Sequence, residues 1–381
     1  MDKIIGTNLG NWLVLEKWMQ PEFFEGTGAE DETWLNRKLN TPENGAAFEA
    51  KMKAHRDTYV TKEDFEFIRA HGMNTVRIPV PYFIFGDYGD YIGCIEYLDR
   101  AFDWAEETGL KILVDLHTSP GCQNGYDNGG LTGVCKFGQK AEDVEFVLTV
   151  LERLAERYAA REALFGIEVL NEPISWIVYA TAPSTGKAAD KEEAKGSKYM
   201  TMPFLKKFYT DAYARIRKYL PEDKAVVFHD GFRLRSWNKF FKESGMKNVY
   251  LDTHIYIFAM EKFVPFPAKF IYSIYLGIDR MRLRATQKAI PVIVGEWCVS
   301  TRYCNNFKQG NLSDEEYKKA RNKRFLEIYD LENRVWDETA GYFYWNYQLG
   351  RDPEKPMDEI WKESWDLKRN ILSGRVPDIM R

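Results

Sequence analysis

The chain has 381 residues, which is enough for one large α/β barrel or two smaller domains, and no Pro-, Gly- or Ser-rich linker divides it. Its 53 basic and 57 acidic residues leave a net charge of -4, so the overall charge gives no reason to expect nucleic acid or an anionic membrane surface as a partner. Aromatic residues make up 15% of the chain and include 11 Trp, and aromatic rings at a cleft suit the apolar faces of sugars, although most should fill the core.

Eight apolar segments are predicted to be strands, most of them closing on a polar or aromatic residue. In chain order they are residues 4–13, which break into a glycine-bearing loop, then 75–80, 112–117, 164–170, 225–228, 249–253, 291–297 and 341–346. Their functional ends are Asn8, Arg77, His117, Glu172, His229, His254, Glu296 and Trp345. Most gaps between these ends admit a helix, so the pattern predicts alternating strands and helices.

Helices are predicted over residues 61–72, 95–109, 142–158 and 202–219, and a further helix starts at the capping box formed by Ser313 and Glu316. Residues 20–60 are read as polar and irregular, and residues 180–198 as a solvated, mobile insertion. The fold expected is a single-domain (β/α)8 barrel over residues 1–381, with elaborated βα loops and a C-terminal extension at 350–381.

Two glutamates end strands in this pattern. Glu172 follows the apolar run 164–170, where Pro173 stops the strand, and Glu296 lies near the end of the run 291–297. Alone, each would more often be a surface residue or an ion-pair partner. Together on the C-terminal rim of one barrel, they predict glycoside hydrolysis, which needs two carboxyl groups across one bond.

Other residues support a sugar site at that rim. Arg77 lies inside an apolar strand and must therefore be paired, either in a structural salt bridge or with a catalytic carboxylate. Residues 118–130 are rich in glycine and amides and include Tyr126, so they offer hydrogen bonds to hydroxyl groups. The chain has no H-E-x-x-H, phosphate loop or G-x-G-x-x-G motif, so metal and nucleotide chemistry are unsupported.

The five cysteines are odd in number and form no C-x-x-C pair, which fits neither a zinc site nor a full disulfide framework. They favour a reducing compartment. The chain enters a strand-like segment without an apolar signal stretch, and no run of ~18 apolar residues could span a membrane. A cytoplasmic location is expected as the sequence is written, and a secreted protein that had lost its leader would look the same.

The sequence resembles glycoside hydrolase family 5, and within it the exo-β-1,3-glucanase branch. The similarity runs through the segment from Asn8 to Glu16, Asp115-Leu116-His117 with its glycine loop, Leu170-Asn171-Glu172-Pro173 and Gly295-Glu296-Trp297. The resemblance implies a retaining β-glycosidase without a cofactor, with Glu172 as acid/base and Glu296 as nucleophile. The substrate-binding residues that it implies are Glu16, Arg77, His117, Tyr126, Asn128, Asn171, His254, Tyr256 and Trp345.

The two carboxyl groups need opposite protonation states, and we expect Arg77 and Tyr256 to lower the pKa of Glu296 while burial and the neighbouring charge raise that of Glu172. Two features depart from the branch: the last strand continues Trp345-Asn346-Tyr347-Gln348-Leu349 instead of Trp-Ser-Trp-Lys-Thr-Glu, and residues 180–198 are extra. Both bear on the choice of substrate.

The predicted function is exo-acting hydrolysis of β-1,3-glucan or its oligosaccharides. The alternatives are a β-glucosidase on small or lipid-like glucosides, an endo-β-1,4-glucanase, and a carbohydrate-binding barrel without turnover. The aromatic segment after Tyr256 is a further candidate, either as packing over outer helices or as a wall of the leaving-group site with Phe258, Phe263 and Phe266 in contact.

Overall fold

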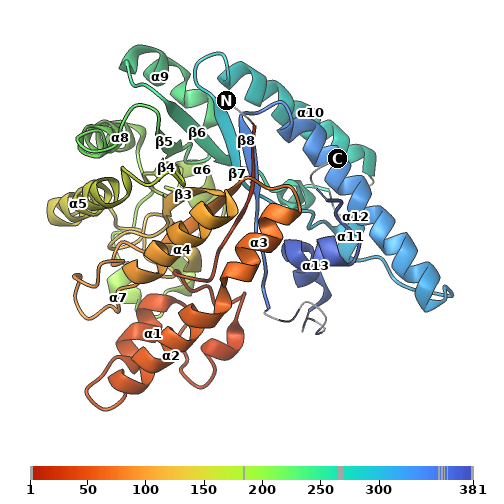
Figure 1. Cartoon of the computed structure of the whole chain (residues 1–381), viewed down its shortest axis with the longest axis horizontal. Helices are drawn as coiled ribbons and strands as arrows, with labels where there is room; N and C mark the ends of the chain where they lie inside the picture. Colours follow the sequence, from red (N-terminus) through yellow and green to blue (C-terminus); the bar gives the residue numbers. More distant parts are fainter. Residues whose placement is uncertain are drawn as a thin grey trace.

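The computed structural model describes residues 3–182, 185–264, 269–350, 352, 355, 357 and 359–378. Eight parallel strands pair in chain order and close into a barrel, with β1 hydrogen-bonded to both β2 and β8 (Figure 1). The strands are β1 Ile4–Asn8, β2 Thr75–Val80, β3 Lys111–Leu116, β4 Leu164–Glu168, β5 Ala225–His229, β6 Val249–His254, β7 Val292–Trp297 and β8 Gly341–Tyr344. The predicted (β/α)8 barrel is confirmed.

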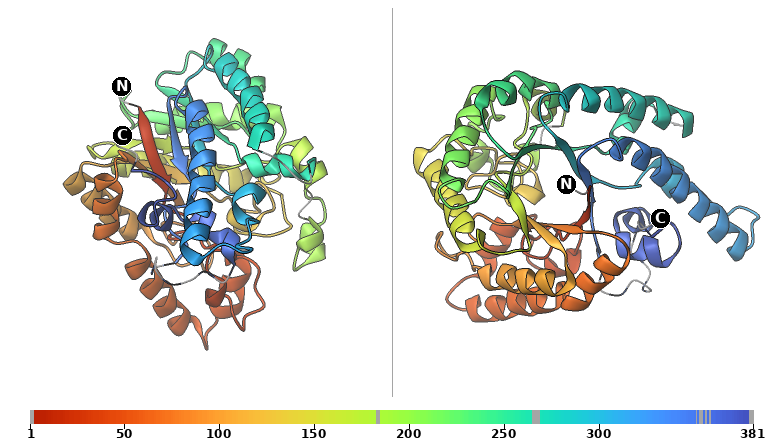
Figure 2. Two further views of the ribbon diagram at one scale, coloured as in Figure 1. Left: turned by 90° about the vertical axis from the view of Figure 1, so that its right-hand side faces the viewer. Right: turned by 45° about the horizontal axis from the view of Figure 1, so that its top comes forward.

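Helices surround the barrel and return antiparallel to the strands (Figure 2). The α-helices are α1 Glu32–Leu39, α2 Gly45–Tyr59, α3 Lys62–Ala70, α4 Ile95–Thr108, α5 Ala141–Tyr158, α6 Trp176–Thr181, α7 Lys191–Ala194, α8 Met202–Ile216, α9 Asn238–Ser244, α10 Lys269–Thr286, α11 Arg302–Asn305, α12 Asp314–Trp336 and α13 Leu367–Leu372. The 3-10 helices are η1 Pro21–Phe23, η2 Asp127–Gly129, η3 Thr185–Lys187, η4 Leu234–Trp237, η5 Ile257–Lys262 and η6 Ile360–Trp365. The predicted capping box of Ser313 with Glu316 is present on α12, and Thr61 forms a second one with Asp64 on α3.

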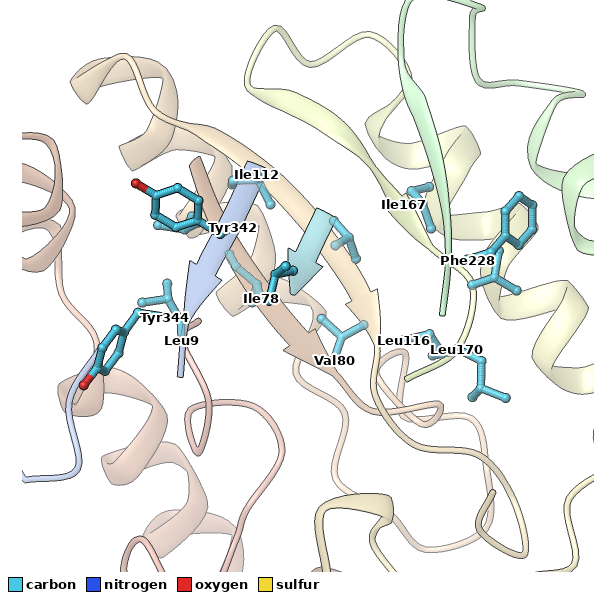
Figure 3. Packing of buried hydrophobic residues seen from close by; sticks show 14 of the residues in the cluster. Leu9, Ile78, Val80, Ile112, Leu116, Ile167, Leu170, Phe228, Tyr342 and Tyr344 are labelled. Atoms are coloured by element: carbon cyan, nitrogen blue, oxygen red, sulfur yellow. The ribbon is translucent and has the colours of Figure 1, made fainter. Parts of the chain in front are cut away.

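The core has two layers because successive strand residues face opposite sides of the barrel wall. The outer layer, between strands and helices, includes Ile78, Ile112 and Ile167 (Figure 3). The inner layer fills the barrel and consists of Ile4, Leu113, Ala225, Val227, Tyr250, Ile293 and Phe343. Alternation therefore turns Arg77, which follows an outer-layer valine and precedes Ile78, into the barrel, where it is fully buried.

Residues 20–60 are not irregular as predicted, because they form η1, α1 and α2. The Asp31 carboxylate caps α1 by accepting a 2.9 Å hydrogen bond from Trp34 N. Phe48 and Met52 of α2 pack against Leu15 and neighbouring apolar residues in a separate small core. The sequence did not predict these helices because their few apolar residues bury against this local core rather than against the barrel.

The segment 180–198, predicted to be a mobile insertion, contains the end of α6, η3 and α7 among its described residues. Glu193 of α7 accepts two 2.8 Å hydrogen bonds from Arg37 of α1, and Ala188 is buried. Its mobility stays a prediction. The C-terminal extension forms η6 and α13, and η6 reaches the rim at the carboxyl ends of the strands.

All five cysteines, Cys94, Cys122, Cys135, Cys298 and Cys304, are buried free thiols. The compartment in which the protein works stays a prediction. Within the described part of the chain, no helix combines the length and apolar character needed to cross a membrane.

Candidate active site

A cavity of about 280 Å³ opens at the carboxyl ends of the strands. Seven of the predicted site residues line it: Glu16, Tyr126, Asn128, Glu172, Tyr256, Glu296 and Trp345. The other four, Arg77, His117, Asn171 and His254, are buried beside or beneath these side chains. The structure thus brings together every residue that the resemblance implied for the site.

Glu296 reaches the cavity through an irregularity in β7. Thr253 pairs with Val294 and His254 with Glu296, so β7 has one extra residue, Gly295, at this point. An added residue of this kind re-aims the side chain that follows it. Only glycine fits here, because a Cβ on Gly295 would lie 2.0 Å from Asp252 Oδ2.

Three side chains hold the Glu296 carboxylate. Arg77 Nη1 donates to Oε1 at 3.1 Å, and the Tyr256 hydroxyl donates to Oε2 at 2.8 Å. His254 Nδ1 lies 3.3 Å from the same Oε2. Both oxygens are therefore fixed in position, which suits a carboxylate that must attack along one direction.

Glu172 stands at a sharp turn after β4, where its φ of 43° is unusual for a residue other than glycine. Asn128 Nδ2 donates to Oε2 at 2.9 Å, and His254 Nδ1 lies 2.8 Å from Oε1. Such strained backbone concentrates at functional sites, where the surrounding contacts hold it. Here the turn directs the carboxylate toward Glu296.

The two glutamates share one partner, because His254 Nδ1 contacts both. The two carboxylate oxygens at this nitrogen are consequently no more than about 6 Å apart. Retaining glycosidases hold their two carboxyl groups roughly 5–5.5 Å apart, whereas inverting ones leave about 6.5–9.5 Å for a water molecule. The arrangement suits retention.

Arg77 organises the floor of the site. Its Nε donates to Glu168 Oε2 at 2.8 Å, and its Nη2 donates to Asn171 Oδ1 at 2.9 Å and lies 3.1 Å from Asp115 Oδ2. Asp115 Oδ2 also lies 2.5 Å from His117 Nδ1. One buried guanidinium therefore ties four strands together with charge-assisted contacts.

Sequence reasoning did not pick out three buried carboxyl groups of this floor, Asp115, Glu168 and Asp252. Each is a charged residue inside an apolar strand, and Asp115 and Asp252 stand two positions before His117 and His254. Two residues is the repeat of one strand face. That spacing was the signal that could have placed them beside the histidines.

The predicted pKa shifts of the two glutamates are wrong in direction for the site as it stands. Burial and the charge of Glu172 raise the pKa of Glu296 and outweigh His254 and Arg77. Burial alone would raise the pKa of Glu172, but the hydrogen bonds from His254 and Asn128 outweigh it, and that pKa is lowered. For Glu172 the main cause is the hydrogen bond from His254, and for Glu296 it is burial; the sequence could give neither the position of His254 nor the depth of burial.

His254 is surrounded by carboxyl groups. Burial opposes the charged imidazole, but Glu296, Asp252 and Glu172 together raise the pKa of His254 well above its ordinary value. Among the described residues, two buried groups could offer ligand atoms to a metal ion, Glu172 with His229 and His254, and Glu168 with Asp252 and His254. Both groups include His254, whose Nδ1 contacts Glu172 and Glu296 and whose Nε2 lies 3.3 Å from Asp252 Oδ2.

Three tryptophans that the sequence did not predict complete the cavity wall: Trp18, Trp361 and Trp365. Trp18 stacks on Trp361 with ring centroids 6.0 Å apart, and Trp365 lies 5.2 Å from the ring of Tyr256. Two of them come from η6, in the C-terminal extension, so no spacing along the sequence linked them to the strand ends.

Two further cavities adjoin this one. A cavity of about 660 Å³ shares Trp18, Tyr126, Asp127 and Trp361 with the catalytic cavity. Another of about 310 Å³ shares Trp361 and Trp365 and reaches Phe258. Of the three phenylalanines proposed as contacts, Phe258 lies at a cavity, Phe263 is exposed, and Phe266 lies outside the described residues.

An eight-stranded α/β barrel with two glutamates held close together in an aromatic cavity at its C-terminal rim defines the chain as a glycoside hydrolase. The family model for cellulase (glycosyl hydrolase family 5) matches residues 39–348. The chain therefore belongs to glycosyl hydrolase family 5.

Relatives and solved structures agree with this assignment. The chain is 36% identical to a glucan 1,3-beta-glucosidase of Blumeria graminis over 98% of this chain and 87% of the relative. It is 32% identical to a probable glucan 1,3-beta-glucosidase A of Aspergillus terreus over 99% of this chain and 88% of the relative. The solved structure of a rutinosidase from Aspergillus niger has the same fold, with a TM-score of 0.74 and 22% sequence identity. The superposition covers 98% of this chain and 97% of that one.

Proposed function

We propose that the protein is a retaining, exo-acting β-glucosidase that releases glucose from β-1,3-glucan or its oligosaccharides. The observation that carries the proposal is the shared contact of Glu172 and Glu296 with His254 Nδ1, at 2.8 and 3.3 Å, inside a cavity walled by aromatic rings. The similarity to two glucan 1,3-beta-glucosidases along nearly the whole chain supports the choice of linkage.

In the first step, a carboxylate oxygen of Glu296 attacks the anomeric carbon while the bond to the leaving oxygen breaks. Glu172 protonates that oxygen, and the sugar remains bound to Glu296 as an ester. Arg77 and Tyr256 orient the attacking carboxylate through their hydrogen bonds of 3.1 and 2.8 Å. In the second step, Glu172 takes a proton from water, which displaces Glu296 with net retention.

His254 is placed to exchange a proton with Glu172. Its Nδ1 lies 2.8 Å from Glu172 Oε1, and the neighbouring carboxyl groups raise the pKa of the imidazole well above its ordinary value. When a sugar excludes water and the glycosidic oxygen approaches Glu172, the proton can pass along this hydrogen bond to the carboxylate. The reversed pKa values of the free site are thus compatible with Glu172 as acid/base.

A second carboxyl pair is placed to bind sugar hydroxyls. Burial and the nearby charge of Asp127 raise the pKa of Glu16 well above its ordinary value. The carboxyl groups of Glu16 and Asp127 both line the cavity and can exchange hydrogen bonds with hydroxyls of a terminal glucose. Trp18 donates to Glu16 Oε2 at 2.8 Å and lines both the catalytic cavity and the cavity of about 660 Å³ beside it.

The proposal is tested by incubating the protein with laminarin-derived and cellulose-derived oligosaccharides and following products by chromatography and anomers by proton NMR. We expect glucose as the first product from the β-1,3 series, in the β configuration before it mutarotates. Longer cello-oligosaccharides as early products would indicate an endo-β-1,4-glucanase, and lack of any hydrolysis would contradict an enzyme. A Glu296→Ala preparation controls for contaminating activity.

We also expect Phe258→Ala to lower kcat/KM about tenfold for a glucoside with a bulky aromatic aglycone, with much less change for a small activated glucoside. Phe258 lines the 310 Å³ cavity beside the catalytic one and packs 5.6 Å from the ring of Trp365. Steady-state kinetics on the two substrates measure the difference.

Phe263→Ala is the matched control for Phe258→Ala. The Phe263 side chain is 85% exposed, so kinetics on both soluble substrates should stay unchanged. Equal losses on both substrates for Phe258→Ala, with a lower melting temperature, would show that Phe258 only packs the loop.

A further inference from the structure

Helix α10 exposes an apolar face that the glycosidase site does not explain. Four large apolar side chains on this face are exposed: Phe270 is 64% exposed, Ile274 60%, Ile278 41% and Met281 65%. Their spacing places all four on one side of the helix. The opposite side, with Tyr272, Leu276 and Leu283, is buried against the protein.

Phe263, directly after η5 and six residues before the start of α10, is a further exposed aromatic side chain of this segment. Gly277 lies on the same side, and a Cβ there would meet nothing within 4 Å. Figures 1 and 2 show α10 at the periphery of the molecule, beside α12. We call Phe263, Phe270, Ile274, Gly277, Ile278 and Met281 the α10 face. Contiguous exposed apolar surface of this kind marks an interaction site.

The charged residues of the segment that carries the α10 face are mostly basic. Between residues 262 and 288 the basic residues are Lys262, Lys269, Arg280, Arg282, Arg284 and Lys288, and the acidic one is Asp279. Asp279, Glu327 and Glu338 pair with four of these cations. Six cations against three carboxylates leave a positive border, although the whole chain has a net charge of -4.

We propose that the α10 face is a docking surface for an anionic lipid bilayer. Apolar side chains bordered by Lys and Arg characterise helices that lie in the membrane interface, with the apolar side in the acyl region and the cations at the headgroups. The net charge of -4 gave no indication of this surface, because its positive charge is confined to residues 262–288.

Charge also selects the bilayer over a second copy of the chain. Two copies meeting through the α10 face would bring their positive borders together, and like charges across an interface are unfavourable. Anionic headgroups complement the same border. Because the helices run antiparallel to the strands, the N-terminal end of α10 lies on the side of the catalytic rim.

The test is flotation of the full chain with vesicles of phosphatidylcholine alone and of phosphatidylcholine with phosphatidylserine. We expect binding to the anionic vesicles that weakens as salt is raised. The double substitution Phe270→Ser and Ile274→Ser should lower binding about tenfold or more, because it removes apolar contact with the acyl region. Lys262→Gln with Lys288→Gln should also lower it about tenfold, on anionic vesicles only.

The matched control is Leu372→Ser on α13, a side chain that is 57% exposed and lies outside the α10 face, and it should bind like the unaltered protein. Hydrolysis of a soluble aryl glucoside, unchanged in every variant, shows that all of them are folded.

Absence of vesicle binding, or binding that the α10 substitutions do not reduce, overturns the proposal. Self-association in light scattering that Phe270→Ser and Ile274→Ser abolish, without vesicle binding, would assign the face to a second copy instead. The outcome is independent of which glucoside the enzyme cleaves.

Discussion

Glu296→Ala is expected to lower kcat for an aryl β-glucoside by about five orders of magnitude, because the double-displacement route has no other nucleophile. Sodium azide should restore turnover and give the α-glucosyl azide, since the small anion enters the space that the carboxylate leaves and attacks from its side. Arg77 and Tyr256, which bind the Glu296 carboxylate at 3.1 and 2.8 Å, remain to hold the azide. Rates and product NMR measure both effects.

Glu172→Ala is the companion to this experiment. On a substrate with an activated leaving group the first step needs no acid, so the glycosyl-enzyme should form and azide should give the β-glucosyl azide. If Glu172→Ala gives the α product and Glu296→Ala the β product, the two roles are reversed. If neither variant loses turnover, the catalytic carboxylates lie elsewhere.

Arg77→Met should lower the free energy of unfolding by about 3–5 kcal/mol and abolish activity. The guanidinium is fully buried and contacts the carboxylates of Asp115, Glu168 and Glu296 at 3.1, 2.8 and 3.1 Å. Methionine fills similar space without the charge, so these carboxylates would be left buried and unpaired. Chemical denaturation of the variant and the unaltered protein at neutral pH measures the difference.

The pH dependence distinguishes lost charge pairing from lost packing. Without Arg77, which opposes the effect of burial, the pKa values of Glu168 and Glu296 rise further above their unfolded values, so the folded state takes up protons as the pH falls. The deficit relative to the unaltered protein should therefore be largest above neutral pH and shrink on acidification. Arg69→Met, the same substitution at an exposed position of α3, should change stability by no more than about 0.5 kcal/mol. A deficit that does not vary with pH would mean that Arg77 acts by packing alone.

The sequence by itself predicted the barrel and the residues that the structure brings together at its rim. Parallel strands are buried on both faces, so they appear in the sequence as apolar runs of strand length. A polar residue at the carboxyl end of such a run lies at the rim of the barrel. Glu172, Glu296 and His254 could be placed in one site for this reason. The helices α1 and α2 were missed because their apolar residues pack only on a small local core.

Tertiary structure decided how the site residues are aimed and charged. Gly295, the extra residue in β7, turns Glu296 into the cavity, and strand alternation alone does not reveal it. His254 contacts both glutamates and lowers the pKa of Glu172, whereas burial keeps the pKa of Glu296 raised, because electrostatic coupling and burial depend on distances that spacing along the chain does not give. Trp361 and Trp365 reach the cavity from the far end of the chain, where only the folding of η6 onto the rim brings them into contact with it.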